Sequence, residues 1–428
     1  MWLTVNPGKR LEGTIRAPPS KSYTHRALLA ASLDGPCRIL NPLDCDDTRR
    51  TADLCVRLGA RIKKDKEGFD IRGCGSLPKR PADGTVQVGE SGTLLRFVLP
   101  ILCLAEGEIR IEGQGTLLKR PNRQVVDVLR SWGGDVQGRG TDHRLPIRIR
   151  GVGSLRGGPG VVDGSVTSQV VSALLMAAPF ACQNTVLSLR GPLVSRPYVD
   201  VTLDVLGWAG IKVTRDGYRR FEVEAGQVFR PRSVFTVHGD YSSSAFLLAA
   251  AAVCESDVTV TDLVDDAQGD RGILTILSDM GAEVIRKGDA VRICGPSRLR
   301  GIDIDGSDIP DLVPVLAVLG CLARGSTRIR NVGHLAFKES NRLTGPAAEL
   351  SRMGGRIRDG KDGLVMREST LHAARVSAHR DHRLAMALAV AALGARMRLT
   401  IAGSECIAKS YPGFVGDMRR LGADMTAK

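Results

Sequence analysis

The feature that most constrains the fold of this sequence is a short glycine pattern that occurs six times. In each copy an apolar residue precedes a glycine, and a β-branched or apolar residue stands three positions after that glycine. This pattern is typical of a helix that ends in a glycine cap and turns into a strand. The copies are LGARI at Gly59, WGGDV at Gly133, AGIKV at Gly210, MGAEV at Gly281, MGGRI at Gly354 and LGADM at Gly422. Their recurrence at about 70 residues indicates a repeated structural unit.

A second pattern, a polar start followed by an apolar helical run, accompanies each glycine pattern. The starts fall near residues 20, 90, 167, 240, 308 and 380. One such run would indicate only a capped, buried helix. Six runs in register with six glycine turns predict six copies of a unit built from strands and helices, and we expect a fold of the α+β class.

Length and repeat together predict two domains of three units each. A chain of 428 residues exceeds the usual size of one hydrophobic core. The sixth unit ends a few residues after its glycine, so we expect the segment from Leu3 to Ile15 to supply the strand material that it lacks. The predicted domains are an N-terminal domain of residues 19–238 and a C-terminal domain of residues 1–18 plus 239–428. Pro18-Pro19 and His238-Gly239 mark the two predicted chain crossings, which form a hinge.

The charge balance narrows the choice of partners. Lys and Arg number 60 and Asp and Glu number 46, so the formal net charge is +14. This excess fits nucleic acid, anionic lipid or small polyanionic substrates. Aromatic residues make up 4% of the chain and no basic run is interleaved with them, which argues against a base-stacking surface. We therefore expect small phosphorylated substrates, with no nucleic acid and no membrane as partners.

Cysteine spacing argues against a metal-binding protein, and hydropathy argues against a membrane-spanning or secreted one. The ten cysteines never form a C-x-x-C pair, and no histidine stands at ligand spacing from the cluster Cys37, Cys45 and Cys55, so we expect reduced thiols and no metal site. No apolar run approaches the roughly 20 residues that span a bilayer, and the first residues do not have the pattern of a signal sequence. We therefore expect a cytoplasmic protein.

The polar residues at the predicted helix starts suit an anion site. A helix N-terminus carries unpaired N–H groups and a partial positive charge, so several buried helices that point at one cleft would bind anions there. Lys21 and Arg26 stand in the first turns of the first run, and Arg383 begins the sixth. Capping does not require these cations, because the helix dipole disfavours a positive charge at this end.

Ten motifs follow one another along the chain in the order PPSKSYTHRALLAASL, ESGTLLR, LLKRP, DGSVTSQVVSALLMAAP, VSRPYVDVTLDVL, GDYSSSAF, DIPD, KESNRL, RDHRLAMA and AKSYPGF. This series resembles the motifs of the 5-enolpyruvylshikimate-3-phosphate synthases (3-phosphoshikimate 1-carboxyvinyltransferases), a family of enolpyruvyl transferases, over almost the whole chain. The resemblance implies two similar domains, each of three βαβαββ-type units with buried helices, in an inside-out α/β barrel. We expect a monomer that uses no cofactor.

The resemblance also implies a reaction. Members of the family transfer the enolpyruvyl group of phosphoenolpyruvate to the 5-hydroxyl of shikimate 3-phosphate, on the route to chorismate and the aromatic amino acids. The transfer is an addition and elimination through a tetrahedral intermediate, and it releases phosphate. It requires a base at the alcohol, an acid at the methylene carbon, and cations around a phosphate and a carboxylate.

The resemblance assigns roles residue by residue. The catalytic residues that it implies are Lys21, Asp311 as the base for the hydroxyl, and Glu339 as the group that protonates and later deprotonates the methylene. Phosphoenolpyruvate is assigned to Lys21, Gly92, Arg120, Gln169, Arg342, Arg383 and Lys409. Shikimate 3-phosphate is assigned to Lys21, Ser22, Arg26, Thr167, Ser168, Gln169, Ser195, Asp311 and Lys338. The alternatives are a helix cap for Asp311 and a surface ion pair of Glu339 with Lys338 or Arg342.

Glu90 and His334 depart from the family's motifs, in which asparagine is common at both places. An acid beside an anion site is unfavourable, so we expect Glu90 to face away or to pair with a basic neighbour. His382 is either satisfied at its helix start or a partner of the phosphate that leaves. Gly92 leaves room for a phosphoenolpyruvate mimic such as glyphosate, but the sequence does not determine sensitivity, because Glu90 and Ser91 alter the surroundings.

Two rival functions are consistent with parts of the sequence. UDP-N-acetylglucosamine enolpyruvyl transferases share the chemistry, but they have asparagine where this chain has Ser22, and the loop LLKRP has no cysteine. An RNA-end-processing or nucleic-acid-binding protein of related fold would fit the positive charge, yet it does not need the acid of KESNR. Shikimate 3-phosphate is therefore the predicted acceptor.

Overall fold

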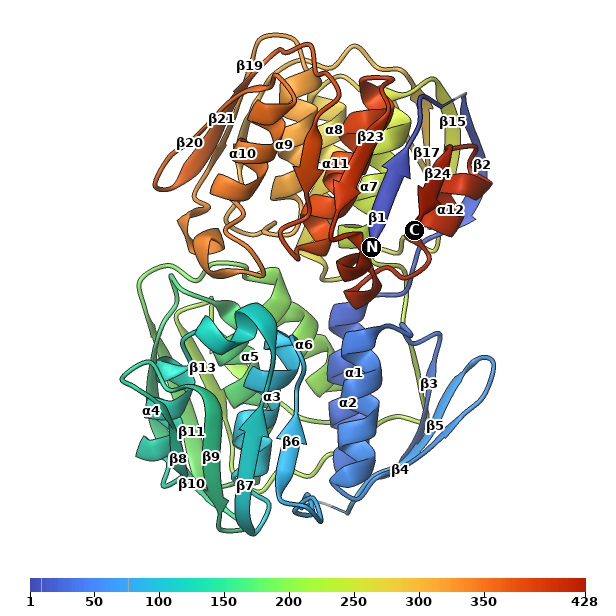
Figure 1. Cartoon of the computed structure of the whole chain (residues 1–428). Coiled ribbons are helices and arrows are strands. Elements are labelled where there is room, and N and C mark those ends of the chain that lie inside the picture. Colours follow the sequence, from blue (N-terminus) through green and yellow to red (C-terminus); the bar gives the residue numbers. More distant parts are fainter. Residues whose placement is uncertain (9, 76) are drawn as a thin grey trace. The chain divides into compact units, whose positions relative to one another are not determined.

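The computed structural model describes residues 1–8, 10–75 and 77–428, and its chain divides into two compact units (Figure 1). The N-terminal unit is the continuous segment Ser20–Val237, and the C-terminal unit combines Met1–Pro19 with His238–Lys428. The chain therefore passes from one unit to the other twice, after Pro19 and after Val237. Within the described residues the strands form six four-stranded sheets.

The described elements follow one another in six repeats of the order βαβαββ. The first repeat comprises β2 (Leu11–Arg16), α1 (Lys21–Leu33), β3 (Pro36–Leu40), α2 (Asp46–Arg57), β4 (Arg61–Lys64) and β5 (Gly68–Arg72). The second comprises β6 (Thr85–Gln87), α3 (Gly92–Leu102), β7 (Gly107–Glu112), α4 (Arg123–Ser131), β8 (Asp135–Arg139) and β9 (Arg144–Gly151). The third comprises β10 (Leu155–Asp163), α5 (Ser168–Ala177), β11 (Ala181–Arg190), α6 (Pro197–Trp208), β12 (Thr214–Asp216) and β13 (Arg220–Val223).

The remaining repeats have the same order. The fourth comprises β14 (Val234–Thr236), α7 (Tyr241–Val253), β15 (Ser256–Thr261), α8 (Ile273–Asp279), β16 (Val284–Lys287) and β17 (Ala290–Gly295). The fifth comprises β18 (Asp303–Asp305), α9 (Val313–Leu322), β19 (Ser326–Arg330), α10 (Thr344–Arg352), β20 (Arg356–Asp359) and β21 (Gly363–Arg367). The sixth comprises β22 (Arg375–Ser377), α11 (His382–Gly394), β23 (Leu399–Ala402), α12 (Phe414–Arg420), β24 (Met425–Ala427) and, from the other end of the chain, β1 (Trp2–Val5). Short 3-10 helices are η1 (Gly115–Lys119), η2 (Ala178–Phe180), η3 (Gly269–Gly272), η4 (Gly333–Phe337) and η5 (Ser404–Lys409).

Strand β1 completes the last sheet, whose order is β22-β23-β1-β24. It runs antiparallel to both neighbours, with Thr4 opposite Thr400 of β23 and opposite Thr426 of β24. In the described chain the sixth repeat has no other second strand after its glycine turn. Residues Trp2–Val5 therefore supply what the closing residues lack, but the later part of the predicted segment Leu3 to Ile15 does not, because β2 joins the sheet of the fourth repeat.

The first and fourth repeats exchange their first strands. β2 runs parallel to β15, with Ile15 opposite Val260, and β14 runs parallel to β3, with Phe235 opposite Ile39. In the other repeats the first strand pairs with the second strand of its own repeat, as β6 does with β7 and β18 with β19. The exchange places β2 in the C-terminal unit and β14 in the N-terminal unit, so it accounts for both chain crossings.

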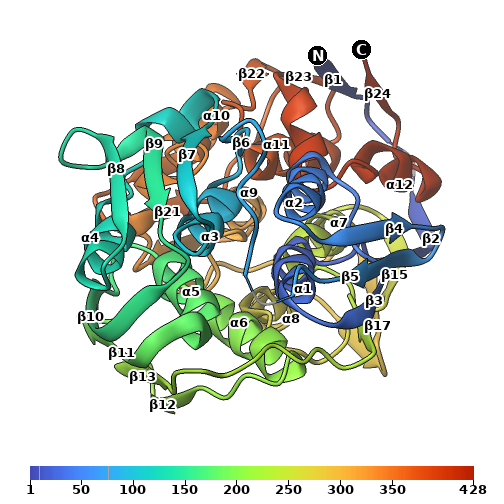
Figure 2. The same ribbon diagram turned by 90° about the horizontal axis from the view of Figure 1, so that it is seen from below.

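The helices that begin the repeats form the core of each unit. Helices α7, α9 and α11 pack against one another in the C-terminal unit and are apolar almost all round, which is the pattern of a buried helix. In the N-terminal unit α1, α3 and α5 are buried in the same way, with the sheets on the outside (Figure 2). This is the helix-inside arrangement that the sequence predicts. No helix in the described ranges is both long and apolar enough to cross a membrane.

The glycine turns lie where the sequence predicts them, but the strand expected directly after Gly210 begins late. Gly59 after α2 has φ 109° and Gly422 after α12 has φ 102°, a conformation that residues with a Cβ rarely adopt. After Gly210 the predicted strand is wrong in its start, because β12 begins only at Thr214. The side chain of Gln227 accepts a hydrogen bond from the N–H of Lys212 at 2.7 Å and donates to its C=O at 2.9 Å. A side chain thus satisfies the backbone that a neighbouring strand would otherwise pair.

Candidate active site

Five of the six core helices are capped by the side chain of the residue before their first turn. The polar residues within those first turns are therefore not needed as caps. Side chains of the cap residues accept hydrogen bonds from N–H groups of the first turn: Ser20 for α1, Ser91 for α3, Thr167 for α5, Asp240 for α7 and Asp381 for α11. Helix α9 differs, because its first flanking residue is Leu312 and no side chain caps it. Asp311 lies before that residue and is not a cap. Its carboxylate contacts two arginines instead.

Arg342 is the centre of an ion-pair cluster in the C-terminal unit. Its side chain is 1% exposed, although it carries a full charge. Its Nη1 contacts Asp311 Oδ1 at 2.6 Å, its Nε contacts Asp381 Oδ2 at 2.8 Å and its Nη2 contacts Glu339 Oε2 at 2.8 Å. A buried guanidinium requires such partners, because an uncompensated charge in the interior is costly. The predicted ion pair of Glu339 with Arg342 is present, but its arginine is buried and not on the surface.

Arg383 joins this cluster to the start of a second helix. Its Nη2 contacts Asp311 Oδ2 at 2.9 Å and its Nη1 donates to Ser243 Oγ at 3.3 Å in the first turn of α7. Its backbone N–H donates to Asp381 Oδ1 at 2.9 Å. The two oxygens of Asp311 are therefore divided between two buried arginines, Arg342 and Arg383.

The charges of the cluster shift its pKa values strongly. Burial alone would raise the pKa of Asp311, but Arg383, Arg342 and Lys338 outweigh burial and hold it well below its usual range. For Arg342 burial opposes the charge, and Asp381, Glu339 and Asp311 outweigh burial and raise its pKa well above the usual value. Asp311 and Arg342 therefore stay charged at neutral pH.

Lys338, Lys409, His334 and His382 lie close to the same cluster. Lys338 follows η4 and is one of the cations that lower the pKa of Asp311. The Nζ of Lys409, at the end of η5, donates to the C=O of Arg380 at 3.3 Å. Burial, with the charges of Lys338 and Arg342, lowers the pKa of His334 to about 3, so its imidazole is neutral. His382 is the buried first residue of α11.

Two acidic residues of this region were not among the predicted site residues. Asp381 is fully buried and holds both Arg342 and the first turn of α11. Asp270 lies in η3, is buried, and accepts a hydrogen bond from Ser242 at the start of α7. Burial, with the charge of Asp311, raises the pKa of Asp270 to about 7. The sequence could have indicated Asp381, because it lies within the motif RDHRLAMA. Asp270 lies in none of the ten motifs, so no local pattern indicates it.

In the N-terminal unit the starts of α3 and α5 bring three predicted residues together. The side chain of Gln169 accepts from Arg96 Nη1 at 2.5 Å and donates to Thr93 Oγ1 at 3.2 Å. A Cβ added to Gly92 would lie 2.6 Å from Arg120 Nη1 and 3.3 Å from Arg96 Nη1. Two guanidinium groups thus crowd the first turn of α3. Sequence reasoning missed Arg96, although it stands about one turn after Gly92, as Arg26 follows Ser22.

Arg26 points into the interior of the N-terminal unit. Its Nε donates to Thr202 Oγ1 at 2.7 Å, its Nη1 to the C=O of Ser22 at 2.9 Å and its Nη2 to the C=O of Tyr198 at 3.0 Å. Burial lowers its pKa to about 10. These bonds tie the first turn of α1 to the first turn of α6. Arg26 therefore supports Ser22, and its direct contact with a substrate phosphate stays a prediction.

The other predicted residues of this unit lie at helix starts. Lys21 begins α1 and its Nζ contacts Asp47 Oδ2 at 3.3 Å. Ser168 begins α5 and is buried. Ser195 precedes α6, has φ 55° and is 3% exposed, and in the described chain its hydroxyl has no hydrogen-bond partner. A buried hydroxyl of this kind is suited to a hydrogen bond with a polar group of a substrate.

Glu90 lies next to the turn that leads to Arg120. Its carboxylate packs against Gly115, the first residue of η1, at a position where a Cβ would collide with it. Gly115 has φ 58°, which also favours glycine there. The structure thus places this acid against the backbone of η1.

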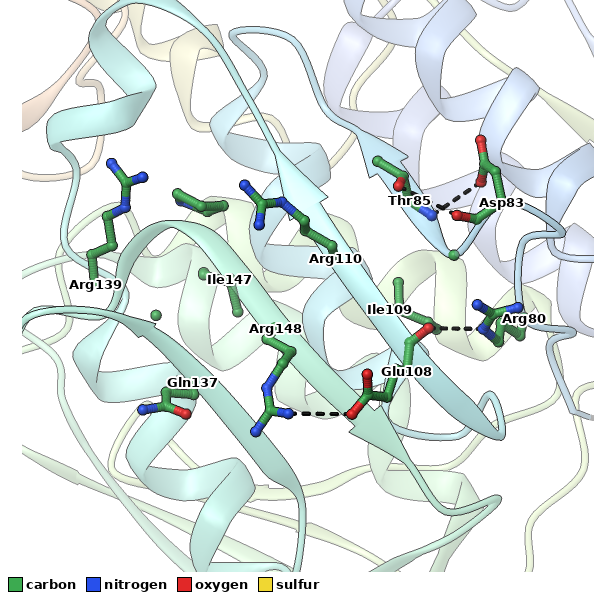
Figure 3. Close-up of a pocket in the computed structure, with 13 residues that line it drawn as sticks. Arg80, Asp83, Thr85, Glu108, Ile109, Arg110, Gln137, Arg139, Ile147 and Arg148 are labelled. Atoms are coloured by element: carbon green, nitrogen blue, oxygen red, sulfur yellow. Dashed lines mark hydrogen bonds and ion pairs between the residues drawn. The ribbon is translucent and has the colours of Figure 1, made fainter.

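A hollow of about 610 Å³ on the N-terminal unit holds none of the predicted site residues. It lies over the exposed side chains of β7, β8 and β9 (Figure 3). Arg80, Arg110, Arg139 and Arg148 line it, but Glu108 lies among them. Glu108 Oε1 pairs with Arg148 Nη1 at 3.2 Å, and its C=O accepts from Arg80 Nε at 2.8 Å. In the described ranges no group of His, Cys, Asp and Glu side chains is arranged to hold a metal ion.

The sequence is similar to known proteins along its whole length. The family EPSP synthase (3-phosphoshikimate 1-carboxyvinyltransferase) matches residues 5–418. A 3-phosphoshikimate 1-carboxyvinyltransferase from Methanocaldococcus jannaschii is 40% identical over 430 residues, which cover 100% of this chain and 99% of that protein. Another from Methanothrix thermoacetophila is 42% identical over 421 residues, or 97% of each chain. The chain belongs to the EPSP synthase family.

Solved structures agree with this assignment. The structure of an EPSP synthase from Acinetobacter baumannii is 26% identical to this chain, covers 100% of both chains and has a TM-score of 0.83. The structure of an enolpyruvyl transferase from Streptomyces tendae is 21% identical, covers 99% of this chain and 98% of that chain, and has a TM-score of 0.79, which shows the fold alone. The predicted family and the predicted α+β fold of the EPSP synthases are confirmed.

Proposed function

We propose that this chain is a 3-phosphoshikimate 1-carboxyvinyltransferase, which transfers the enolpyruvyl group of phosphoenolpyruvate to the 5-hydroxyl of shikimate 3-phosphate and releases phosphate. The observation that carries the proposal is the cluster in which buried Arg342 contacts both Asp311 and Glu339, in a chain of the EPSP synthase family. Addition and elimination need a base, an acid and cations for the anionic substrate. The cluster supplies all three kinds of group.

Asp311 is proposed as the base for the 5-hydroxyl. In the structure Arg342 and Arg383 hold its pKa low, so the carboxylate is ionised but weakly basic. The carboxylate and phosphate of phosphoenolpyruvate would bind to further N–H groups of these arginines and offset their charge. The pKa of Asp311 would then rise toward the range in which it accepts a proton. The base therefore becomes effective once the anionic substrate is bound.

Glu339 is proposed as the group that protonates the methylene carbon and later removes the proton. Its side chain is 23% exposed, so a substrate can reach it, whereas Arg342 beside it is buried. Asp311 and Glu339 contact different nitrogens of Arg342. One guanidinium thus fixes the spacing of the two groups that move protons.

The remaining assignments are supported by charge and by position at helix starts. Phosphoenolpyruvate is proposed to contact Lys21, Gly92, Arg120, Gln169, Arg342, Arg383 and Lys409. Shikimate 3-phosphate is proposed to contact Lys21, Ser22, Arg26, Thr167, Ser168, Gln169, Ser195, Asp311 and Lys338. The buried hydroxyl of Ser195 supports a phosphate there. A monomeric state and a cytoplasmic location stay predictions.

The acceptor is tested by phosphate release from phosphoenolpyruvate with the purified full chain. We expect turnover with shikimate 3-phosphate and none above background with UDP-N-acetylglucosamine, because the chain belongs to the family named for the shikimate acceptor. Equal or faster turnover with the sugar nucleotide would reverse the assignment. Binding of RNA with a steep salt dependence and no phosphate release would replace it altogether.

The role of Glu339 is tested by Glu339→Gln. The amide oxygen can still accept from Arg342, but the amide cannot transfer a proton, so kcat should fall at least about 100-fold. The melting temperature should stay within about 2 °C of the unchanged protein. Glu368→Gln, at an exposed residue after β21, is the matched control and should keep full activity. If the variant loses stability and not turnover, Glu339 is a structural residue.

A further inference from the structure

A tight turn of unusual conformation precedes helix α11. The N–H of Asp381 donates to the C=O of Ala378 at 2.8 Å, and the two residues between them, His379 and Arg380, have φ 48° and 62°. Positive φ at both central positions is the arrangement of a type I′ turn, which favours glycine and asparagine. Histidine and arginine adopt it at a conformational cost. Neighbouring groups must therefore hold the turn in place.

A buried carboxylate on α10 holds this turn. Glu349 is 0% exposed, and its Oε1 lies 2.6 Å from His379 Nε2. Its Oε2 accepts from the N–H of Ser377 at 3.1 Å, and the N–H of His379 donates to Ser377 Oγ at 3.2 Å. One carboxylate thus contacts the chain both before the turn and within it. The side chain of His379 is 42% exposed, so the buried carboxylate of Glu349 contacts a ring that lies partly at the surface.

The same turn sets the position of three cations proposed for phosphoenolpyruvate. Asp381, its last residue, contacts Arg342 Nε at 2.8 Å and accepts from the N–H of Arg383 at 2.9 Å. The C=O of Arg380 accepts from Lys409 Nζ at 3.3 Å. These three cations come from separate elements, and each has a direct contact with the turn. A change in the turn would displace all three together.

We propose that Glu349 and His379 are positioning residues for phosphoenolpyruvate, which act by holding the turn Ala378–Asp381 in its left-handed conformation. The inference rests on the proposed function, because it takes the three cations as ligands of that substrate. Neither residue is placed in contact with the substrate. The Glu349–His379 contact fixes the backbone at His379 and Arg380, and the backbone fixes Asp381 and, through it, Arg342 and Arg383.

The test compares His379→Ala with His379→Gly in the full-length protein. Alanine removes the contact with Glu349 and keeps the cost of positive φ, so the turn relaxes and the KM for phosphoenolpyruvate should rise at least about tenfold. Glycine also removes the contact but adopts positive φ without that cost. In His379→Gly the KM for phosphoenolpyruvate should return to within about threefold of the unchanged protein. The KM for shikimate 3-phosphate should stay within about twofold in both variants.

The control is Arg352→Gln. Arg352 stands on the same helix and its Nη1 lies 3.8 Å from Glu349 Oε1, but it is 62% exposed and does not contact the turn. It should leave both KM values unchanged. Melting temperatures of all variants, measured in parallel, separate a local change from loss of the fold.

Three results would overturn the inference. The first is an unchanged KM for phosphoenolpyruvate in folded His379→Ala. The second is an equal rise in the KM of both substrates, and the third is a glycine variant no better than alanine. Failure of the proposed function looks different, because the unchanged protein itself would then release no phosphate from phosphoenolpyruvate with shikimate 3-phosphate.

Discussion

Two carboxyl groups of the C-terminal unit, Asp311 and Asp270, have pKa values shifted in opposite directions. For Asp311 the cations Arg383 and Arg342 outweigh burial, so the pKa falls. Asp270 is buried beside Ser242, and burial together with the charge of Asp311 raises its pKa to about 7. When the pKa values of two neighbouring acids shift in opposite directions, one acid is ionised at a pH at which the other still holds its proton. Asp311 therefore stays ionised at neutral pH, whereas Asp270 is mainly protonated only below about pH 7.

The raised pKa of Asp270 predicts how stability changes with pH. An unfolded aspartate has a pKa of about 3.9, so between about pH 4 and pH 7 the folded state binds more protons than the unfolded state. The free energy of unfolding therefore falls as the pH rises through this window. Asp270→Asn removes the effect, because an amide does not ionise. The melting temperature of the variant relative to the unchanged protein should rise by at least about 2 °C from pH 5 to pH 8.

Differential scanning calorimetry at both pH values measures this difference. Asp359→Asn, at an exposed position in β20, is the control and should show no such trend. A difference between variant and unchanged protein that stays constant, or that falls as the pH rises, would contradict the protonated state of Asp270.

At the scale of elements, the core helices and their glycine ends were predictable because local rules decide them. Ser20, Ser91 and Asp381 are ordinary caps before apolar runs, and the structure begins α1, α3 and α11 directly after them. The fifth run differs, since α9 begins at Val313 and not near residue 308. Pro310 restricts Ile309 to extended conformations, so the helix cannot include it. Asp311 precedes the flanking residue Leu312 and so lies outside the helix, where its carboxylate contacts two arginines.

Other features could not be predicted, because distant residues decide them. The sequence predicts both chain crossings but not the sheets that receive the strands: β2 pairs with β15 of the fourth repeat and β14 with β3 of the first. In the candidate site, the motifs gave the residue types but not the partners. Asp381 with Arg342 and Glu349 with His379 are pairs from different elements, and only the packing of α10 beside α11 brings them together.

A substitution in the first turn of α3 should change substrate binding without a loss of stability. In Gly92→Ala the new Cβ would lie 2.6 Å from Arg120 Nη1, so the guanidinium must move. It can do so because it is the end of a flexible side chain. The fold should tolerate this movement. The KM for phosphoenolpyruvate should rise about tenfold, while the KM for shikimate 3-phosphate changes less than about twofold. Steady-state kinetics with each substrate varied in turn measures both values.

Gly207→Ala is the matched control for this substitution. Gly207 lies in α6 with open space around its Cβ position, so alanine there should stabilise the protein by about 0.5–1 kcal/mol and leave both KM values unchanged. If Gly92→Ala lowers the melting temperature without a change in either KM, the glycine serves the packing of α3 and not the site.

At the scale of the whole molecule, the two units differ in how the chain builds them. The N-terminal unit is one continuous segment, Ser20–Val237, which contains all strands of its three sheets, including β14. The C-terminal unit needs β1 and β2 from the other end of the chain. Because only the N-terminal unit is a continuous segment, we expect only this unit to fold on its own.

Fragments test this asymmetry. Residues 20–237 alone should unfold in one cooperative thermal transition, because their core helices and sheets are complete. Residues 238–428 alone should show no such transition, since one sheet lacks an inner strand and another an edge strand. Addition of a peptide of residues 1–19 should restore the transition. A cooperative transition of residues 238–428 without the peptide, followed by circular dichroism, would contradict the prediction.

Strand β1 also sets the order of events during synthesis. Residues Trp2–Val5 are synthesised long before β23 and β24, the strands with which they pair. The segment that precedes α1 must stay unpaired while the N-terminal unit folds behind it, with apolar Leu3 and Val5 open to solvent or to chaperones. Strand β1 therefore cannot take its place in the sheet until β23 and β24 have been made.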